Sequence, residues 1–330
     1  MKKIILFLIA LVSTMTANVQ AQDFNKGGRT AFQFTKIGIG ARQAAMGEAS
    51  ISHVRDVNAV FWNPANLSGI QAGEASFSYV RWLADMNLLA GAVGWRWQGV
   101  GVFALSYAAL DYGDIDEALA VGGSGSSDTR TGNVFTGSDL LFGFSFAREF
   151  TDKLAIGLSA KFLQEKLFNY SETAFAFDAG TSYEVGFKSI RLAMSLQNFS
   201  VGSAKWLAVS DRTEGYDIPL LFKLGASVAL AGAGEKDSFL RLGENHRVLM
   251  SIEAINSNDY DERIHLGGEY TFGGFFALRG GYRMNYEEGS WSFGLGLQPR
   301  VSNLDMRLDY AYVSYEFLDS PHRLTASFAF

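Results

Sequence analysis

Cysteine is absent from this chain of 330 residues. Its absence excludes a disulfide framework, a thiolate zinc site, an iron–sulfur cluster and a cysteine nucleophile. Proline is scarce, with four residues, and charged residues make up only 19% of the chain, whereas aromatic residues reach 14%. This combination is unusual for a soluble enzyme. It favours a protein whose outer surface is not in contact with water.

The sequence also has no excess of basic residues. It contains 28 Lys and Arg residues and 34 Asp and Glu residues, which gives a net charge of −6. Nucleic-acid binding needs a basic face that neutralises phosphates, so we expect no nucleic-acid partner. The chain is also too apolar, with 48% hydrophobic residues, to be disordered.

Catalytic signatures are lacking too, since the sequence contains neither a Gly-x-Ser-x-Gly elbow nor a P-loop. The four histidines, His53, His246, His265 and His322, do not have the spacing of metal ligands. We therefore predict no enzymatic activity, no metal site and no cofactor.

After its first 21 residues the chain has no run of 18 or more apolar residues, which excludes a helical membrane protein. Residues 1–21 have the layout of a secretory signal peptide that is cut after Ala21. Two lysines precede the apolar run 4–12, whose nine residues fall short of the roughly 20 that cross a bilayer. We therefore expect export from a bacterial cytoplasm to the periplasm, the medium or the outer membrane.

Apolar residues alternate with small or polar residues along most of the chain after residue 72. In the run 291–297, the odd positions hold Trp, Phe, Leu and Leu, whereas the even positions hold Ser, Gly and Gly. This period of two gives a strand one apolar face and one small or polar face. We expect fourteen such strands, at 73–83, 87–97, 99–110, 139–150, 153–167, 173–187, 189–199, 219–230, 247–256, 262–273, 275–286, 290–300, 303–316 and 321–330.

The length of these runs distinguishes two classes of β protein. Each run holds about ten residues, which a tilted strand needs to cross a membrane, whereas soluble strands average about five or six. A soluble sandwich also alternates, and it stays the alternative. Charged residues lie on the small-residue face, as a polar barrel lumen requires. We therefore predict an all-β protein: an antiparallel outer-membrane β-barrel of about 14 strands over residues 73–330, in contact with outer-membrane lipid.

The connections between the strands fall into two classes. Four of them, around Gln98, 151–152, Lys188 and 273–274, are tight, as periplasmic turns are. The connections 111–138 and 200–218 are long, as external loops are, and belong to the other end of the barrel. Segment 231–246 is long although its place in the order predicts a periplasmic turn. Either the strand order is wrong there, or this loop has a function of its own.

Six charged residues on the late strands are predicted to face the lumen. They are Arg263, Glu269, Arg279, Arg283, Arg307 and Asp309. An ion-pair ladder that grips a plug is the interpretation we favour, because charges in a narrow lumen usually pair. A charged permeation path is the alternative. The same alternation predicts that Tyr286 points outward, and the closing strand ends on Phe330, which we expect to be the signal for outer-membrane assembly.

Residues 22–72 do not alternate. The stretch 41–49 is rich in small helix formers, and 56–61 predicts another short helical turn, which ends at the Asn63-Pro64 pair. A small, apolar, partly helical segment needs a place to bury its apolar surface, and the barrel lumen offers one. We predict a plug over 22–72; an extension packed under the periplasmic rim is the alternative.

The same region resembles the opening of the PorV/PorQ family, through FTKIGIGAR (34–42), MGEA (46–49), Asp56 and FWNPANL (61–67). The late runs RIHLGGEYTF, FALRGGYR, SFGLGL, LDYAY and HRLTASFAF resemble the second half of that family. The motif residues are Gly38, Gly40, Ala41, Arg42, Met46, Gly47, Trp62, Asn63, Pro64 and Ala65. Glu48 and Asn66 stand where the family more often has Gly.

This resemblance implies a barrel similar to the FadL type, with fourteen strands and an N-terminal plug. Members of the PorV/PorQ family belong to type IX secretion, as partners of a large secretion channel and of surface-attachment proteins. The resemblance therefore implies a protein that binds such a channel or exported cargo through loops 111–138 and 200–218. The alternative is a FadL-like transporter of hydrophobic small molecules. A third option, an outer-membrane hydrolase, has no visible catalytic motif.

Overall fold

The computed structural model describes residues 30–118, 130–200, 202, 204–207, 213–232, 238–243, 245–301 and 304–330. The signal peptide predicted at 1–21 lies outside the described residues. No helix in the described part of the chain is long and apolar enough to cross a membrane.

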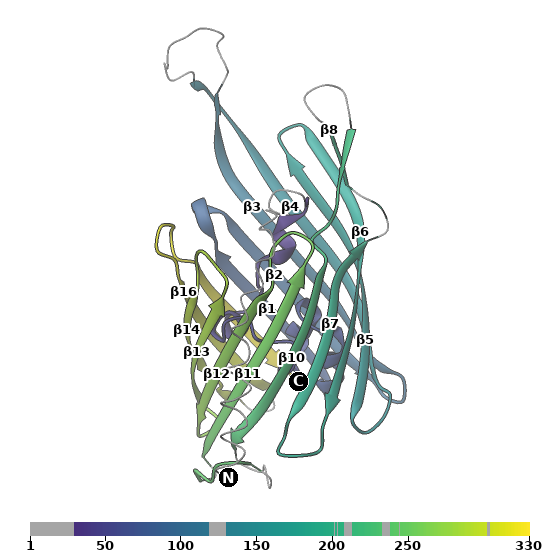
Figure 1. Ribbon diagram of the computed structural model, residues 1–330, viewed down its shortest axis with the longest axis vertical. Helices are drawn as coiled ribbons and strands as arrows, with labels where there is room; N and C mark the ends of the chain where they lie inside the picture. Colours follow the sequence, from purple (N-terminus) through teal and green to yellow (C-terminus); the bar gives the residue numbers. More distant parts are fainter. Residues whose placement is uncertain are drawn as a thin grey trace, which may run out of the picture.

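Fourteen antiparallel strands form one closed barrel (Figure 1). They are β1 (Gly73–Arg81), β2 (Asn87–Trp97), β3 (Gly101–Ala118), β4 (Arg130–Glu149), β5 (Leu154–Leu167), β6 (Tyr170–Glu184), β7 (Arg191–Ser200), β10 (Leu221–Ala231), β11 (His246–Ser257), β12 (Arg263–Phe272), β13 (Phe276–Met284), β14 (Trp291–Leu297), β16 (Leu304–Ser314) and β17 (His322–Ala329). Each strand pairs with the next one in this order, and β17 pairs with β1. The predicted all-β barrel is confirmed, and the sandwich alternative is wrong, because one sheet closes on itself.

The two faces of the wall carry different side chains. Large apolar residues point outward, as shown by Phe77, which is 65% exposed, and Leu295, which is 49% exposed. Positions between them hold small or polar residues such as Ser76 and Ser292, which are buried. Neighbouring strands keep this alternation in register, with Leu295 opposite Leu278. The outward faces therefore join into an apolar band of the kind that contacts lipid.

Leu295→Arg tests this assignment of faces. The variant is expected to lose about 2–4 kcal/mol of unfolding free energy, because an arginine on the lipid face must be buried in hydrocarbon. Phe275→Arg is the control, since Phe275 lies in the turn between β12 and β13, where the expected loss is about 0–1 kcal/mol. Urea unfolding of the protein in lipid vesicles measures both. Equal losses would contradict the assignment.

Tyr286 does not follow the alternation, and the prediction that it points outward is wrong. Its hydroxyl lies 2.9 Å from Nε2 of His265, a buried residue of the inward face. The reason is local, because β13 ends at Met284 and Asn285 has a left-handed φ of 62°. The chain turns there, and the period of two ends with the strand.

The two ends of the barrel differ in the length of their connections. The turns 98–100, 150–153, 185–190 and 273–275 are short and lie at the end where Phe330 follows β17; we call it the proximal end. β3 and β4 extend farthest at the opposite, distal end, where β5, β6 and β8 also rise above the late strands (Figure 1). The exchange of backbone hydrogen bonds between Phe330 and Gly73 closes the wall. The role of Phe330 in assembly stays a prediction.

Two predicted distal loops contain regular structure. In the connection 111–138, strand β3 continues to Ala118 and β4 begins at Arg130; residues 119–129 are outside the described part. The connection 200–218 contains a small hairpin of β8 (Ala204–Leu207) and β9 (Thr213–Tyr216). The period of two is missing from the projecting parts of β3 and β4 because neither face of a two-stranded ribbon is covered by a core.

Segment 231–246 does join β10 to β11 at the proximal end, so the strand order around it is regular. Within its described residues, the Leu240 N–H donates to the Leu230 carbonyl at 2.7 Å. The Phe239 ring packs edge-on against Phe187 of the neighbouring turn, with the centroids 6.4 Å apart. The described part of this connection therefore contacts the end of β10 and the turn between β6 and β7.

Residues 30–72, here called the N-terminal segment, lie inside the barrel (Figure 1). They form η2 (Gln33–Lys36), α2 (Ala41–Ala45), η3 (Val57–Phe61) and η4 (Pro64–Gly69); a further turn, η5 (Leu83–Asp85), lies between β1 and β2. Side chains cap two of these helices: Asp56 accepts from Asn58 N–H, and Asn63 accepts from Ala65 N–H. Pro64 suits the first helical position, where no N–H is needed.

The helix predicted over 41–49 is shorter than expected. It ends at Ala45, because Gly47 and Glu48 have left-handed φ angles of 63° and 64°. Such angles are common for glycine and unfavourable for glutamate.

Candidate functional site

The N-terminal segment is packed directly onto the backbone of the wall. A Cβ atom at Gly281 on β13 would overlap the backbone nitrogen of Gly47, and one at Gly157 on β5 would overlap the peptide between Pro64 and Ala65. Glycine therefore allows the segment and the strands to touch at two places on different sides of the lumen. The part of the segment from α2 to η4 is an integral layer of the packed interior.

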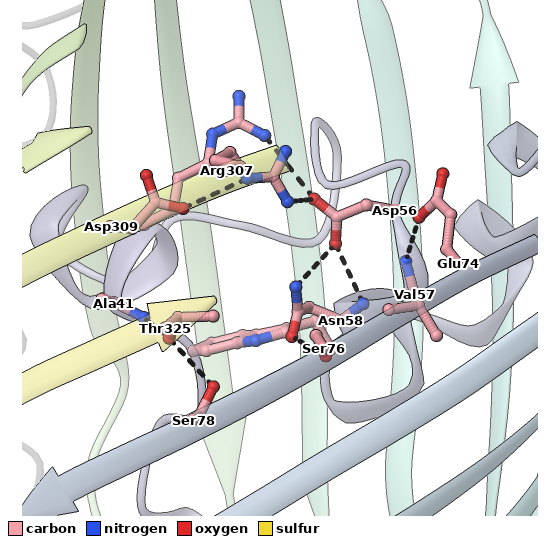
Figure 2. A network of polar contacts seen from close by, with 12 residues as sticks. Ala41, Asp56, Val57, Asn58, Glu74, Ser76, Ser78, Arg307, Asp309 and Thr325 are labelled. Atoms are coloured by element: carbon pink, nitrogen blue, oxygen red, sulfur yellow. Dashed lines mark hydrogen bonds and ion pairs between the residues drawn. The ribbon is translucent and has the colours of Figure 1, made fainter. Parts of the chain in front are cut away.

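The motif residues of the segment shape and anchor it. The Trp62 indole donates to the Ile39 carbonyl at 2.9 Å, and the Asn63 amide donates to the carbonyls of Ile51 and Thr181. The remaining motif residues, Gly38, Gly40, Ala41, Met46, Gly47, Pro64 and Ala65, are buried. Ala41 N–H donates to Oγ1 of Thr325 at 2.8 Å, which joins α2 to β17 (Figure 2).

Six charged residues form a closed ring between the segment and the wall, which we call the charge ring. In order around the ring they are Arg42, Glu269, Arg279, Asp309, Arg307 and Asp56. Positive and negative side chains alternate throughout, so the three charges of each sign balance. Arg42 and Asp56 come from the N-terminal segment, and the other four come from β12, β13 and β16.

The wall residues of the ring are bonded closely to one another. Arg279 donates to Glu269 at 2.6 Å and to Asp309 at 2.7 Å, and its side chain has no exposed surface. Arg307 Nε lies 3.1 Å from Asp309. Because the strands hold these positions in register, the sheet itself places Glu269 opposite Arg279.

The segment closes the ring from the other side. Arg42 donates through two nitrogens to both carboxylate oxygens of Glu269, each at 2.8 Å. Arg307 donates to Asp56, whose other oxygen caps η3 through Asn58 (Figure 2). Nη1 of Arg42 lies 3.9 Å from Asp56 and completes the circuit.

The two other predicted lumen charges lie outside the ring. Arg283 donates to Glu48 at 3.3 Å, whereas the Arg263 guanidinium lies between the rings of Tyr260 and Tyr286, 3.7 and 4.0 Å from their centroids. Glu48 also lies 3.9 Å from Arg323. These two ion pairs account for a glutamate in a left-handed conformation.

Sequence reasoning missed the partners that the segment contributes. Asp56 and Glu48 appeared only as positions of the family pattern, and Arg323, which lies on β17, appeared only within the run HRLTASFAF. The only indication of these residues in the sequence was a single charged residue among apolar or small ones. His53 stands nearby, and its burial lowers the pKa of the imidazole to about 3, with repulsion by Arg42 adding to the effect. The His53 imidazole is therefore neutral and does not change the balance of positive and negative charges in the charge ring.

The charge ring borders cavities at the proximal end. One of about 310 Å³ is lined by Arg42, Glu269 and Arg307, and one of about 570 Å³ by Asp56 and Arg307. Their linings share Gly274, Gln298 and Arg307, so we treat them as one proximal vestibule. The ring forms the inner end of this polar vestibule.

Part of the lumen beside β1 to β6 carries an apolar patch, where larger side chains such as Leu88, Leu110 and Leu141 stand in place of the expected small or polar ones. The inner face of the same strands also holds buried polar residues such as Ser106, Asp139 and Lys161. The apolar residues of the patch are Val80, Leu88, Ala90, Ala108, Leu110, Leu141, Leu163 and Ala176. Phe32, Phe34 and Ile39 of the N-terminal segment pack against them.

A small cavity remains between the N-terminal segment and this apolar patch, and we call it the lumen chamber. Its volume is about 50 Å³. Apolar side chains that include Phe34, Ile37, Leu88 and Leu141 line about half of it, and polar side chains such as Gln197 line the rest. The charged residues in its lining are Lys36, Glu48, Lys161 and Lys223.

Solved structures with the same fold include two toluene transporters. The Ralstonia pickettii transporter TbuX shares 14% identity over 88% of this chain and 97% of its own, with a TM-score of 0.57. The Pseudomonas putida transporter TodX shares 12% identity with the same coverage and a TM-score of 0.60. A Pseudomonas aeruginosa FadL homologue shares 10% over 88% and 98% of the two chains, with a TM-score of 0.55.

At these identities the likeness shows the fold, which is that of a FadL-like barrel. A scan of protein-family models and a search of curated proteins match nothing. The narrower resemblance to the PorV/PorQ family is not supported by these findings.

Proposed function

We propose that this protein lies in the bacterial outer membrane and conducts small apolar molecules across it. The observation that carries this proposal is the apolar patch on the inner wall of β1 to β6, faced by Phe32, Phe34 and Ile39. A barrel that conducts polar solutes has a polar, water-filled interior. The structures of two toluene transporters with this fold support the proposal.

The lumen chamber must widen to accept such a molecule. Its volume of about 50 Å³ is below the ~150 Å³ of a dry cavity that binds benzene. Phe34 is buried and fills part of the same space. The part of the segment around η2 has no glycine contact with the wall of the kind that holds Gly47 and Ala65. A movement around η2 would therefore open the chamber while the charge ring stays closed.

Phe34→Ala tests the proposal. Removing the ring leaves an apolar cavity, so the variant is expected to bind toluene about tenfold or more tightly than the native chain, since benzene-sized ligands fill such cavities. Isothermal titration calorimetry on the protein in detergent gives the affinities. Phe77→Ala, which removes the same side chain from the outer surface, is the control. If the native chain and Phe34→Ala both fail to bind toluene, the proposal is wrong.

A second candidate function, partnership with a secretion channel or with exported proteins, has one observation in its favour. The ribbon of β3 and β4 and the β8–β9 hairpin project at the distal end, where the predicted contact loops 111–138 and 200–218 lie (Figure 1). A pull-down from the native outer membrane in mild detergent, read by mass spectrometry, tests it. A large barrel or exported proteins in stoichiometric amounts would support this function.

A further inference from the structure

The connection 231–246 is longer than the other turns at the proximal end, although it joins two neighbouring strands. Its described part 238–243, here called the proximal loop, is attached at an irregularity of the sheet. β10 contains one extra residue, Leu230, in its pairing with β11. The Leu230 carbonyl accepts from the Leu240 N–H at 2.7 Å. A backbone hydrogen bond therefore fixes the proximal loop at the end of the wall.

The proximal loop exposes large apolar side chains. Phe239 is 52% exposed, Leu240 is 47% exposed and Leu242 is 48% exposed. Phe187, in the neighbouring turn 185–190, is 58% exposed and packs edge-on against Phe239. Exposed apolar surface of this kind is unfavourable in water, and a tight turn would avoid it. The loop therefore adds apolar surface to the proximal rim in addition to joining two strands.

Basic side chains accompany this apolar surface. Nζ of Lys188 lies 5.7 Å from the centroid of the Phe239 ring. Arg241 stands between Leu240 and Leu242 in the chain and is exposed. An apolar surface edged by cations fits the interface of a bilayer, where acyl chains adjoin phosphate groups.

The turn that carries Lys188 has an unfavourable backbone conformation. Lys188 and Ser189 have left-handed φ angles of 52° and 53°, and the Ile190 N–H donates to the Phe187 carbonyl at 3.1 Å. Tight turns with two positive φ angles favour Asn and Gly. The Ser189 hydroxyl lies 3.3 Å from the Ala229 carbonyl of β10. The turn thus holds a lysine beside the proximal loop although glycine would relieve the strain.

We propose that the proximal loop and the turn 185–190 form an anchor that binds anionic phospholipid of the adjoining membrane leaflet. Leu224, on the outer face of β10, is 44% exposed and belongs to the apolar band that contacts lipid. The anchor continues this band beyond the end of the strand. Its apolar side chains enter the acyl region, and Lys188 and Arg241 meet the phosphates. The inference uses the membrane placement of the proposed function and does not depend on conduction.

The test uses single cysteines as attachment points, because the chain has none of its own. Leu240→Cys, labelled with nitrobenzoxadiazole on the folded, heat-modifiable barrel in vesicles, is expected to be quenched severalfold more by lipid-attached nitroxide than by aqueous iodide. Asp152→Cys, an exposed position in the proximal turn 150–153, is the matched control and is expected to show the reverse order. Leu224→Cys on the lipid face is the positive control for nitroxide quenching.

The same label tests the choice of headgroup. Nitroxide-labelled phosphatidylglycerol and nitroxide-labelled phosphatidylcholine are compared at equal, low mole fraction in phosphatidylcholine vesicles. Quenching at Leu240→Cys is expected to be about fivefold stronger with the phosphatidylglycerol probe, as a cation near the membrane surface predicts. Adding Lys188→Gln and Arg241→Gln is expected to remove the preference. Arg300→Gln, which removes an exposed cation from β15 at the same end, is the control and should keep it.

Three results would overturn the inference. Iodide quenching at Leu240→Cys as strong as at Asp152→Cys would place the proximal loop in water. Equal quenching by the two lipid probes would exclude anionic phospholipid as the partner. Both results leave the proposed function standing, provided that lipid-attached nitroxide quenches Leu224→Cys. If lipid-attached nitroxide quenches neither Leu224→Cys nor Leu240→Cys, the membrane placement is wrong, and the proposed function fails with it.

Discussion

Arg279→Met is expected to destabilise the barrel by about 3–5 kcal/mol, because removing one partner of a buried ion pair leaves the opposite charges uncompensated. The Arg279 side chain has no exposed surface and bridges Glu269 and Asp309. Methionine has a similar length but offers neither charge nor hydrogen bonds. Both carboxylates then lose a donor although their side chains are only 4% and 1% exposed.

The matched control is Arg300→Met at the proximal end. Arg300 pairs with Asp305, but their side chains are 75% and 56% exposed. Exposed ion pairs add little to stability, because water and salt screen them, so this variant should stay near the native stability. Urea unfolding in lipid vesicles, followed by tryptophan fluorescence, gives both values. A native-like midpoint for Arg279→Met would show that the charge ring adds nothing to stability.

The same pair of variants tests whether the ring closes the vestibule. Since the ring forms the inner end of the proximal vestibule, Arg279→Met is expected to raise ion conductance in planar bilayers. Arg300→Met, which lies outside the ring, is expected to leave the conductance unchanged. Equal conductance in the two variants would contradict a sealing role.

Gly281→Val is expected to displace the N-terminal segment from the wall. A Cβ at this position overlaps the backbone of Gly47, and neither backbone can yield, since Gly281 lies in β13 between two paired strands. Overpacking usually costs about 1–3 kcal/mol, and we expect a loss of about 3 kcal/mol because the clash is with backbone atoms.

The adjacent residue provides the control. A Cβ at Gly280 has no neighbour closer than 4.0 Å, so Gly280→Val should fold with native stability. Because the chain has no cysteine, Ser52→Cys can serve as a single reporter on the buried segment. Its reaction with a maleimide is expected to be slow in the native background and with Gly280→Val, and fast with Gly281→Val. Equal labelling rates would refute the close packing of the segment.

The barrel wall could be read from the sequence because its signal is local. A strand shows its two faces through alternate residues, and all fourteen predicted strands coincide with observed ones, although β3 and β4 are longer than predicted. The prediction of strand ends and of side-chain direction failed where the chain has no buried face, because nothing there requires apolar and polar residues to alternate. The projecting ends of β3 and β4 show this, as does Tyr286 beyond the end of β13.

The sequence by itself determined that the chain forms a barrel wall with an apolar outer face, since the faces of a strand depend only on which residues alternate. Only the tertiary structure decided what lies within it. Arg42 meets Glu269 across 227 positions of the chain, and Asp56 meets Arg307 across 251. Such pairings depend on barrel closure and on the path of the N-terminal segment, because long-range contacts leave no periodic trace in the residues that make them.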